Sequence, residues 1–162
     1  MEVAASIFAV VQLADRVLSL CGNYLQSARS AKDDIERVSV EVGTLKSVLE
    51  RADQMVNDEI MKEYMSDSLR QELEKIITSC QLTLKNLDSK LNHNQQESGI
   101  RKLLRLSALK WPFKSKEVMN IIQELDRHKG TITLTLQLDR SETLNYLHIG
   151  LHILTWYLVG QT

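Results

Sequence analysis

The chain has 162 residues, of which 43% are hydrophobic and 25% are charged, and its formal net charge is −1. A domain of this length buries roughly two thirds of the surface that its unfolded chain exposes, so its core needs no disulfide or structural metal. One proline and six glycines are too few for an all-β chain with many turns. The near-zero net charge also argues against the global basicity of a nucleic-acid-binding domain.

The first predicted helix covers residues 3–28 and is apolar on nearly every face. Only Asp15 and Arg16 carry charge within it. Because a helix that is apolar all round is usually buried, we expect it to be the central, most buried helix. Glu2 stands where a secretory signal would carry a basic residue, so we expect no such signal. The main row of apolar residues recurs every three or four positions and consists of Val3, Ile7, Val10, Ala14, Val17, Cys21 and Tyr24. A second apolar row beside it consists of Phe8, Val11, Leu18 and Leu25.

The second and third predicted helices each bury one side. The second begins near Ser30, where Ser30-Ala-Lys-Asp33 resembles a capping box. The third begins at a similar signal, Ser68-Leu-Arg-Gln71, and ends at the polar run 92–99, which we predict to be a loop. Residues 57–67 predict a turn with a short helical piece. The expected core rows are Ile35, Val38, Val42, Leu45, Leu49, Ala52 and Val56, then Leu69, Leu73, Ile76, Cys80, Leu84, Leu87 and Leu91.

The fourth predicted helix follows Pro112, which disfavours helix at the residue before it. Ser115 is the expected cap, with Glu117 in the first turn, where an acidic side chain is stabilising. Residues 131–139 alternate apolar and polar like a strand, but a lone strand would have no partner, so we predict helix. Residues 143–162 are mostly apolar, and we expect a fifth helix docked on the bundle. The alternatives are an exposed apolar tail or the edge of a longer polypeptide.

These segments predict an all-α fold, an antiparallel bundle of about four long helices. Four helices of about 23–26 residues would each span roughly 35–39 Å at 1.5 Å per residue. Matched lengths joined by short polar connections suit an antiparallel bundle, whereas a two-stranded coiled coil buries only a narrow seam. We expect the bundle domain to cover residues 1–140 and an apolar tail or extra helix to cover residues 141–162.

Motifs that would support catalysis or cofactor binding are missing from the sequence. It holds no phosphate-binding glycine loop and no Gly-x-Ser-x-Gly element. His148 and His152 lie one helical turn apart, but zinc needs further ligands. Cys21 and Cys80 fall on apolar rows and are expected to be reduced, buried side chains. We therefore expect a non-enzymatic protein with no cofactor, no metal and no small-molecule substrate.

A basic segment interrupted by apolar residues is the most suggestive feature. Residues 98–116 contain no acidic residue, and residues 98–129 carry a net charge of +5. The segment suits a solvated connection whose leucines pack inward, an anionic membrane surface or an acidic protein surface; nucleic-acid phosphates are the least favoured partner. The candidate contact residues here are Arg101, Lys102, Arg105, Lys110, Trp111, Phe113, Lys114 and Lys116.

Two stretches resemble a known family. The opening Met-Glu-Val-Ala-Ala-Ser-Ile-Phe-Ala-Val-Val-Gln-Leu-Ala-Asp-Arg-Val resembles the start of fungal NLR-like (STAND) receptors. Leu109-Lys-Trp-Pro-Phe-Lys-Ser-Lys-Glu-Val, followed by Ile122-Gln-Glu-Leu-Asp-Arg-His-Lys, resembles the later part of the same N-terminal domain. The resemblance covers about residues 1–140, and its most specific marker is Lys-Trp-Pro-Phe.

The resemblance implies a HeLo-like helical bundle that usually precedes a NACHT module and repeats. The implied role is signalling or cell-death execution in fungal non-self recognition, through protein partners or self-association in the cytoplasm. Some members associate with membranes, and by that analogy the first helix would be membrane-active, although residues 3–14 alone are too short to span a bilayer. No NACHT or repeat region follows in this chain, so receptor activity is not carried over. A structural bundle without signalling output is a further alternative. The candidate contacts in the first helix are Val3, Ile7, Phe8 and Val11.

Overall fold

The computed structural model describes residues 2–27, 30–59, 65–103 and 110–159, with side chains except at 2, 94–103, 138–143, 146, 147, 150 and 152–159. Within these ranges the chain forms four long helices and no strand. They are α1 (Glu2–Ser27), α2 (Lys32–Asn57), α4 (Asp67–Leu103) and α5 (Ser115–Val159). The predicted all-α bundle of four long helices is therefore confirmed. Residues 60–64, in the middle of the connection expected between residues 57 and 67, lie outside the described residues.

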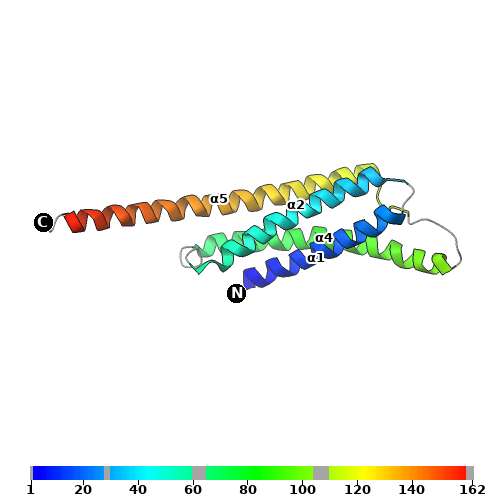
Figure 1. Cartoon of the computed structure of the whole chain (residues 1–162), viewed down its shortest axis with the longest axis horizontal. Coiled ribbons are helices and arrows are strands. Elements are labelled where there is room, and N and C mark those ends of the chain that lie inside the picture. The colour runs from blue at the N-terminus through cyan, green and yellow to red at the C-terminus, as the bar shows by residue number, and fades with distance from the viewer. Residues whose placement is uncertain (1, 28–29, 60–64, 104–109, 160–162) are drawn as a thin grey trace.

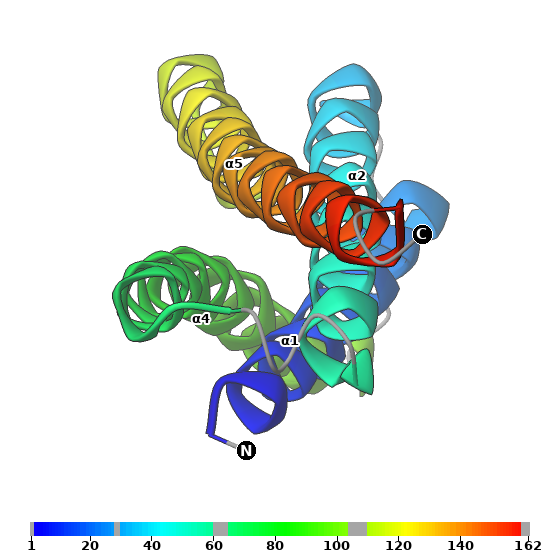
Figure 2. The same ribbon diagram turned by 90° about the vertical axis from the view of Figure 1, so that its left-hand side faces the viewer.

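The four helices run antiparallel to one another in chain order (Figure 1). α1 packs on α2 and α4, and α5 packs on the same two helices from the other side. Figure 2 shows this arrangement end on, with α1 and α5 at opposite corners. The expectation that α1 is the central helix is therefore wrong, and α1 has an outward face like the other three.

The outward face of α1 explains why its apolar count was misleading. Ala5, Phe8 and Ala9 are exposed. Part of the apolar content of α1 therefore faces away from the core, as two small side chains and one large ring. The two charges in the middle of α1, Asp15 and Arg16, pair with the neighbouring helices. Arg16 Nε lies 2.7 Å from Asp88 Oδ1 of α4, and Asp15 Oδ1 lies 2.6 Å from Lys46 Nζ of α2.

The core follows the three-and-four rows of the sequence closely. The main rows predicted for α1 and α2 are buried at every position. In α4 the row departs from the prediction at two positions, because Leu69 and Ile76 are only half-buried and Ile77 is buried in place of Ile76. α5 completes the core with Val118, Leu125 and Ile132. Side chains on one helical face recur every three or four residues, which is why the periodicity locates them.

The helix starts differ from the expected caps in α2 and α4. α2 begins at Lys32 after Ala31, which has a left-handed backbone (φ 66°), and no side chain caps it. The capping box expected at Ser30 is therefore wrong. α4 begins one residue before Ser68, and the Ser66 hydroxyl oxygen accepts a hydrogen bond from the Leu69 N–H at 3.2 Å. The cap of α4 is thus a serine two positions earlier than predicted.

Two interruptions expected along the chain do not occur. Residues 92–99 continue α4 to Leu103 where a loop was predicted. The polar side chains of that run tolerate helix, and Gly99 alone costs only about 1 kcal/mol there. The helix predicted over residues 131–139 is confirmed as part of α5. α5 also continues across residue 141, the expected domain boundary, to Val159. The expected docked fifth helix is wrong, since no proline or turn signal separates residues 143–159 from α5.

Candidate interaction surface

The candidate contacts of α1 divide between its two faces. Val3 and Ile7 are buried in the core, so their side chains are not available to a partner in the folded bundle. Phe8 is 58% exposed, and Val11 is half-buried at the core edge. Only Phe8 among the four therefore presents a large apolar side chain to solvent.

α1 is, within the described part of the chain, the one helix long and apolar enough to cross a membrane by length and composition alone. Residues 3–14 alone are too short to span a bilayer, but the helix continues to Ser27 and is longer than that run. The core helix of a globular protein passes the same test. Transfer of α1 to a membrane would expose to water the apolar side chains of α2 and α4 that α1 covers in the bundle. At about 1.5–3 kcal/mol for each large apolar side chain, that loss approaches the whole stability of a domain.

The basic segment is only partly described. The side chains of Arg101 and Lys102, and all of Arg105, lie outside the described residues. Lys110, Lys114 and Lys116 are exposed. Three lysines therefore lie on the surface where α5 begins.

Trp111 and Phe113 differ from the sequence interpretation, because they are buried at 6% and 7% exposure. The Trp111 ring packs edge-on against Tyr24 at a centroid distance of 5.4 Å and against Phe113 at 5.0 Å. Tyr24 donates a buried hydrogen bond of 2.9 Å to the Leu91 carbonyl of α4. This aromatic cluster closes one end of the bundle and joins α1, α4 and the segment before α5. It stabilises the fold and leaves no aromatic contact here for a partner.

The aromatic cluster also positions the start of α5. Lys90 Nζ lies 5.3 Å from the Phe113 ring centroid and 3.2 Å from Glu117 Oε1. Glu117 Oε2 accepts a hydrogen bond of 2.9 Å from the Lys114 backbone N–H. That hydrogen bond, followed by the one from Lys90, lowers the pKa of Glu117. The first-turn role expected for Glu117 is confirmed, although α5 includes Ser115 and the preceding residue is the cap.

The two candidate regions lie at opposite ends of the bundle. Trp111 contacts Tyr24, which lies sixteen residues beyond Phe8 on the same helix. At 1.5 Å per residue the separation along α1 is about 24 Å. The folded bundle therefore does not combine Phe8 and the lysines near Trp111 into one patch.

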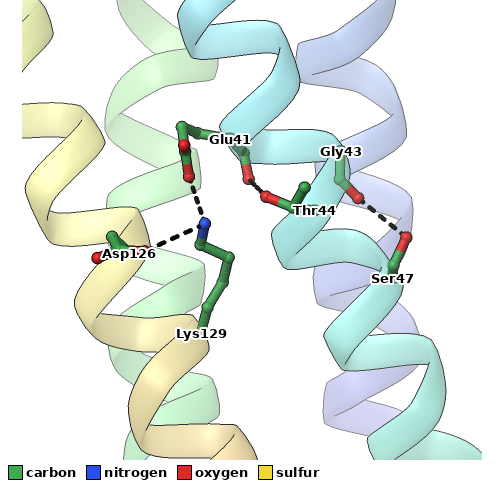
Figure 3. A network of polar contacts seen from close by, with 6 residues as sticks. All are labelled: Glu41, Gly43, Thr44, Ser47, Asp126 and Lys129. Carbon is green, nitrogen blue, oxygen red and sulfur yellow. Dashed lines mark hydrogen bonds and ion pairs between the residues drawn. The ribbon is translucent and has the colours of Figure 1, made fainter.

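Polar contacts between α2 and α5 form a separate network (Figure 3). Lys129 of α5 bridges Glu41 of α2 and Asp126, whose carboxylate lies 3.3 Å from the ammonium group. Burial alone would lower the pKa of Lys129, but the hydrogen bonds to the two carboxylates outweigh it and the pKa is raised. The lysine is therefore charged and serves as a bridge between helices. Sequence reasoning missed it, since charges on separate helices carry no signal of pairing.

A buried histidine links α4 and α5. His128 Nε2 lies 3.0 Å from the Thr83 hydroxyl oxygen, and both side chains are buried. The Thr83 hydroxyl also lies 3.3 Å from the Ser79 carbonyl, to which it can donate. It then accepts from the imidazole in the tautomer that carries its proton on Nε2. Burial lowers the pKa of His128. No motif in the sequence indicated this link between Thr83 and His128.

Reactive groups are also placed inside the fold. Burial raises the pKa of Cys21 and of Cys80 to about 12, so both remain thiols at neutral pH. Among the described residues no group of three His, Cys, Asp or Glu side chains could hold a metal ion.

A groove of about 500 Å³ lies between α4 and α5. Its described lining mixes apolar and polar side chains, and its cation, Lys90, already pairs with Glu117. The described lining residues are Thr83, Asn86, Leu87, Ser89, Lys90, Phe113, Ile121 and Glu124.

Large apolar side chains on the outside of the molecule are the remaining candidates. Besides Phe8, they include Leu144, Ile149 and Leu151 of α5, with exposures of 58%, 56% and 63%. The N-terminal end of α1 and the C-terminal part of α5 lie at the same end of the bundle (Figure 1). Among the described residues, that end therefore carries several exposed apolar side chains that a partner could cover. No family model, no curated protein and no solved structure matches this chain, so the functional argument depends on these surfaces.

Proposed function

We propose that the chain is a non-enzymatic, cytoplasmic signalling module that acts through helix-mediated protein association. The observation that carries the proposal is the exposure of Phe8, Leu144 and Leu151 on an otherwise well-packed bundle. Large apolar side chains gathered at one end of a molecule mark contact sites for proteins or membranes. The resemblance to the HeLo-like domain of fungal NLR-like receptors supports the signalling part of the proposal.

The alternative is a membrane effector, which the length and apolar composition of α1 favour. In that mechanism α1 enters the bilayer while the basic segment binds acidic headgroups. The separation between Phe8 and the lysines near Trp111 counts against it for the folded bundle. So does the burial of Val3 and Ile7, because insertion must first unpack the core.

Photo-crosslinking in cells tests the proposal directly. A photoreactive amino acid replaces Phe8 or Leu151 in the full chain, and matched controls replace Glu36 or Lys85, which are exposed polar residues of α2 and α4. We expect protein adducts at the two apolar positions and none at the controls. Adducts to lipid alone, or equal labelling at all four positions, would contradict protein association.

Vesicle co-sedimentation tests the alternative. Neutral and acidic vesicles are compared at low and moderate salt, using the wild-type chain and a variant with Lys110→Gln, Lys114→Gln and Lys116→Gln. We expect the wild-type chain to remain in the supernatant. Salt-sensitive binding to acidic vesicles that disappears in the variant would establish the membrane effector and replace our proposal.

A further inference from the structure

The C-terminal part of α5 extends beyond the bundle as a single helix. We call residues 143–159 the projecting end. Figure 1 shows that no other helix lies alongside it. Leu144, Ile149 and Leu151 are exposed there, whereas α5 buries Val118, Leu125 and Ile132 against α2 and α4. The projecting end therefore carries apolar side chains that its own chain does not cover.

The sequence of the projecting end has two rows at helical spacing. Leucines occur at 144, 147, 151, 154 and 158, with steps of three and four residues. Polar residues occur at 145, 148, 152 and 155, with steps of three, four and three. Residues spaced in this way share one side of a helix. The projecting end is therefore amphipathic, and residues 143–162 contain no Asp, Glu, Lys or Arg.

We propose that the leucine row of the projecting end packs against the same row of a second copy of this chain. The inference rests on the proposed function and names the partner for one of its surfaces. Apolar residues repeating at the first and fourth positions of seven form the seam of associating helices. A row that contacts its own copy is self-complementary, as the interface of a two-fold dimer requires.

The composition favours a second copy over a membrane. Seventeen residues of helix span about 25 Å, less than the roughly 30 Å hydrocarbon core of a bilayer. A helix that lies on a membrane surface usually carries Lys or Arg on its polar side, and the polar row here holds Asn145, His148, His152 and Thr155 instead. The absence of Asp, Glu, Lys and Arg also removes charge repulsion between two identical helices.

The leucine row is long enough for a weak contact between two copies. The transfer free energy of a leucine side chain corresponds to about 100 Å² of apolar surface. A contact through the five leucine positions of each copy would bury at most about 1,000 Å², the lower limit of specific interfaces. Ile149 lies outside the leucine row, so a pair of helices leaves it exposed. We expect assemblies larger than a dimer at high protein concentration.

Sedimentation equilibrium of three full-length proteins tests the proposal. They are the wild-type chain, the variant Leu144→Ser with Leu151→Ser, and the matched control Asn145→Ser with His148→Ser. All four substituted side chains are exposed in the single chain, so neither variant disturbs the core, and circular dichroism confirms this. We expect the wild-type chain and the control to associate, and the leucine variant to dissociate on the order of a hundredfold more readily.

Several outcomes would overturn the proposal. A wild-type chain that is monomeric at every concentration has no such contact. Equal weakening in the control and the leucine variant would place the interface elsewhere. Binding of the wild-type chain to neutral vesicles that is lost in the leucine variant would assign the row to a membrane. A monomeric wild-type chain that still forms protein adducts at Phe8 would refute self-association and leave the proposed function standing.

Discussion

α5 contains two regions that both carry apolar rows at helical spacing but have different surroundings. In its first part Leu125 is buried between helices, and in its projecting end Leu151 is 63% exposed. Both leucines belong to rows spaced by three and four residues, and both lie in one unbroken helix. The periodicity therefore predicts a helix with an apolar face in each region. It does not tell which molecule covers that face, because the partner depends on where the other helices end.

The largest expected effect is the difference in stability between a leucine-to-alanine substitution in the first part of α5 and one in its projecting end. Leu125→Ala removes buried methyl groups and leaves a cavity, so we expect the free energy of unfolding to fall by about 2–5 kcal/mol. Leu151→Ala changes an exposed side chain, and we expect a change within about 0.5 kcal/mol. Urea unfolding at low protein concentration, where the chains are separate, measures both. A large loss in Leu151→Ala under these conditions would mean that the projecting end folds back on the bundle.

The faces of the helices could be predicted from the sequence almost residue by residue. Val38, Val42 and Leu45 are buried as expected, because helical spacing fixes which side chains share a side. The sequence does not tell which helix packs against each apolar face. The apolar composition of α1 therefore suggests a central helix, although α1 lies at a corner of the bundle. The contact between Lys129 and Glu41 could not be predicted either, because it depends on which helices pair. Trp111 of the basic segment was expected to contact a partner for a similar reason. Its ring is buried against Tyr24, a contact that depends on how the helices pack.

The buried histidine of the first part of α5 predicts a pH dependence. Burial lowers the pKa of His128 in the folded chain, so the unfolded chain takes up a proton first as the pH falls through about 6.5. The free energy of unfolding therefore does not change with pH through this site above about pH 6.5, and it decreases as the pH falls below that value. Urea unfolding between pH 8 and pH 5 measures the decrease. His128→Gln should reduce the slope in this interval, and an unchanged slope would assign the dependence to other groups.

The hydrogen bond to the same histidine gives a smaller effect. Thr83→Val keeps the shape of the side chain and removes the acceptor of the imidazole N–H. A buried donor left without a partner costs about 1–3 kcal/mol. Thr78→Val is the matched control, because Thr78 is exposed on the same helix and its hydroxyl likewise donates to a carbonyl four residues earlier. Equal losses in the two variants would show that His128 does not depend on Thr83.

The ion pair between α2 and α5 is expected to contribute less. Lys129 and Glu41 retain 17% and 24% side-chain exposure, so solvent screens their attraction and the pair contributes about 1 kcal/mol. A double-mutant cycle of Lys129→Met and Glu41→Gln measures this coupling in urea unfolding. We expect the coupling to weaken at high salt, since the pair is partly exposed. A coupling of zero would mean that this ion pair does not contribute to the packing of α2 on α5.

The smallest effect compares a glycine in each region. Gly130 lies inside α5, and a Cβ atom added there would meet no heavy atom within 4 Å. Alanine is favoured over glycine in a helix, so Gly130→Ala should raise the free energy of unfolding by about 0.5–1 kcal/mol. Gly150→Ala should increase helical content by circular dichroism without changing the unfolding of the bundle, because the projecting end is not packed on it. If Gly150→Ala stabilised the bundle as much as Gly130→Ala, α5 would unfold as one cooperative unit, and the distinction between its two regions would apply to burial only.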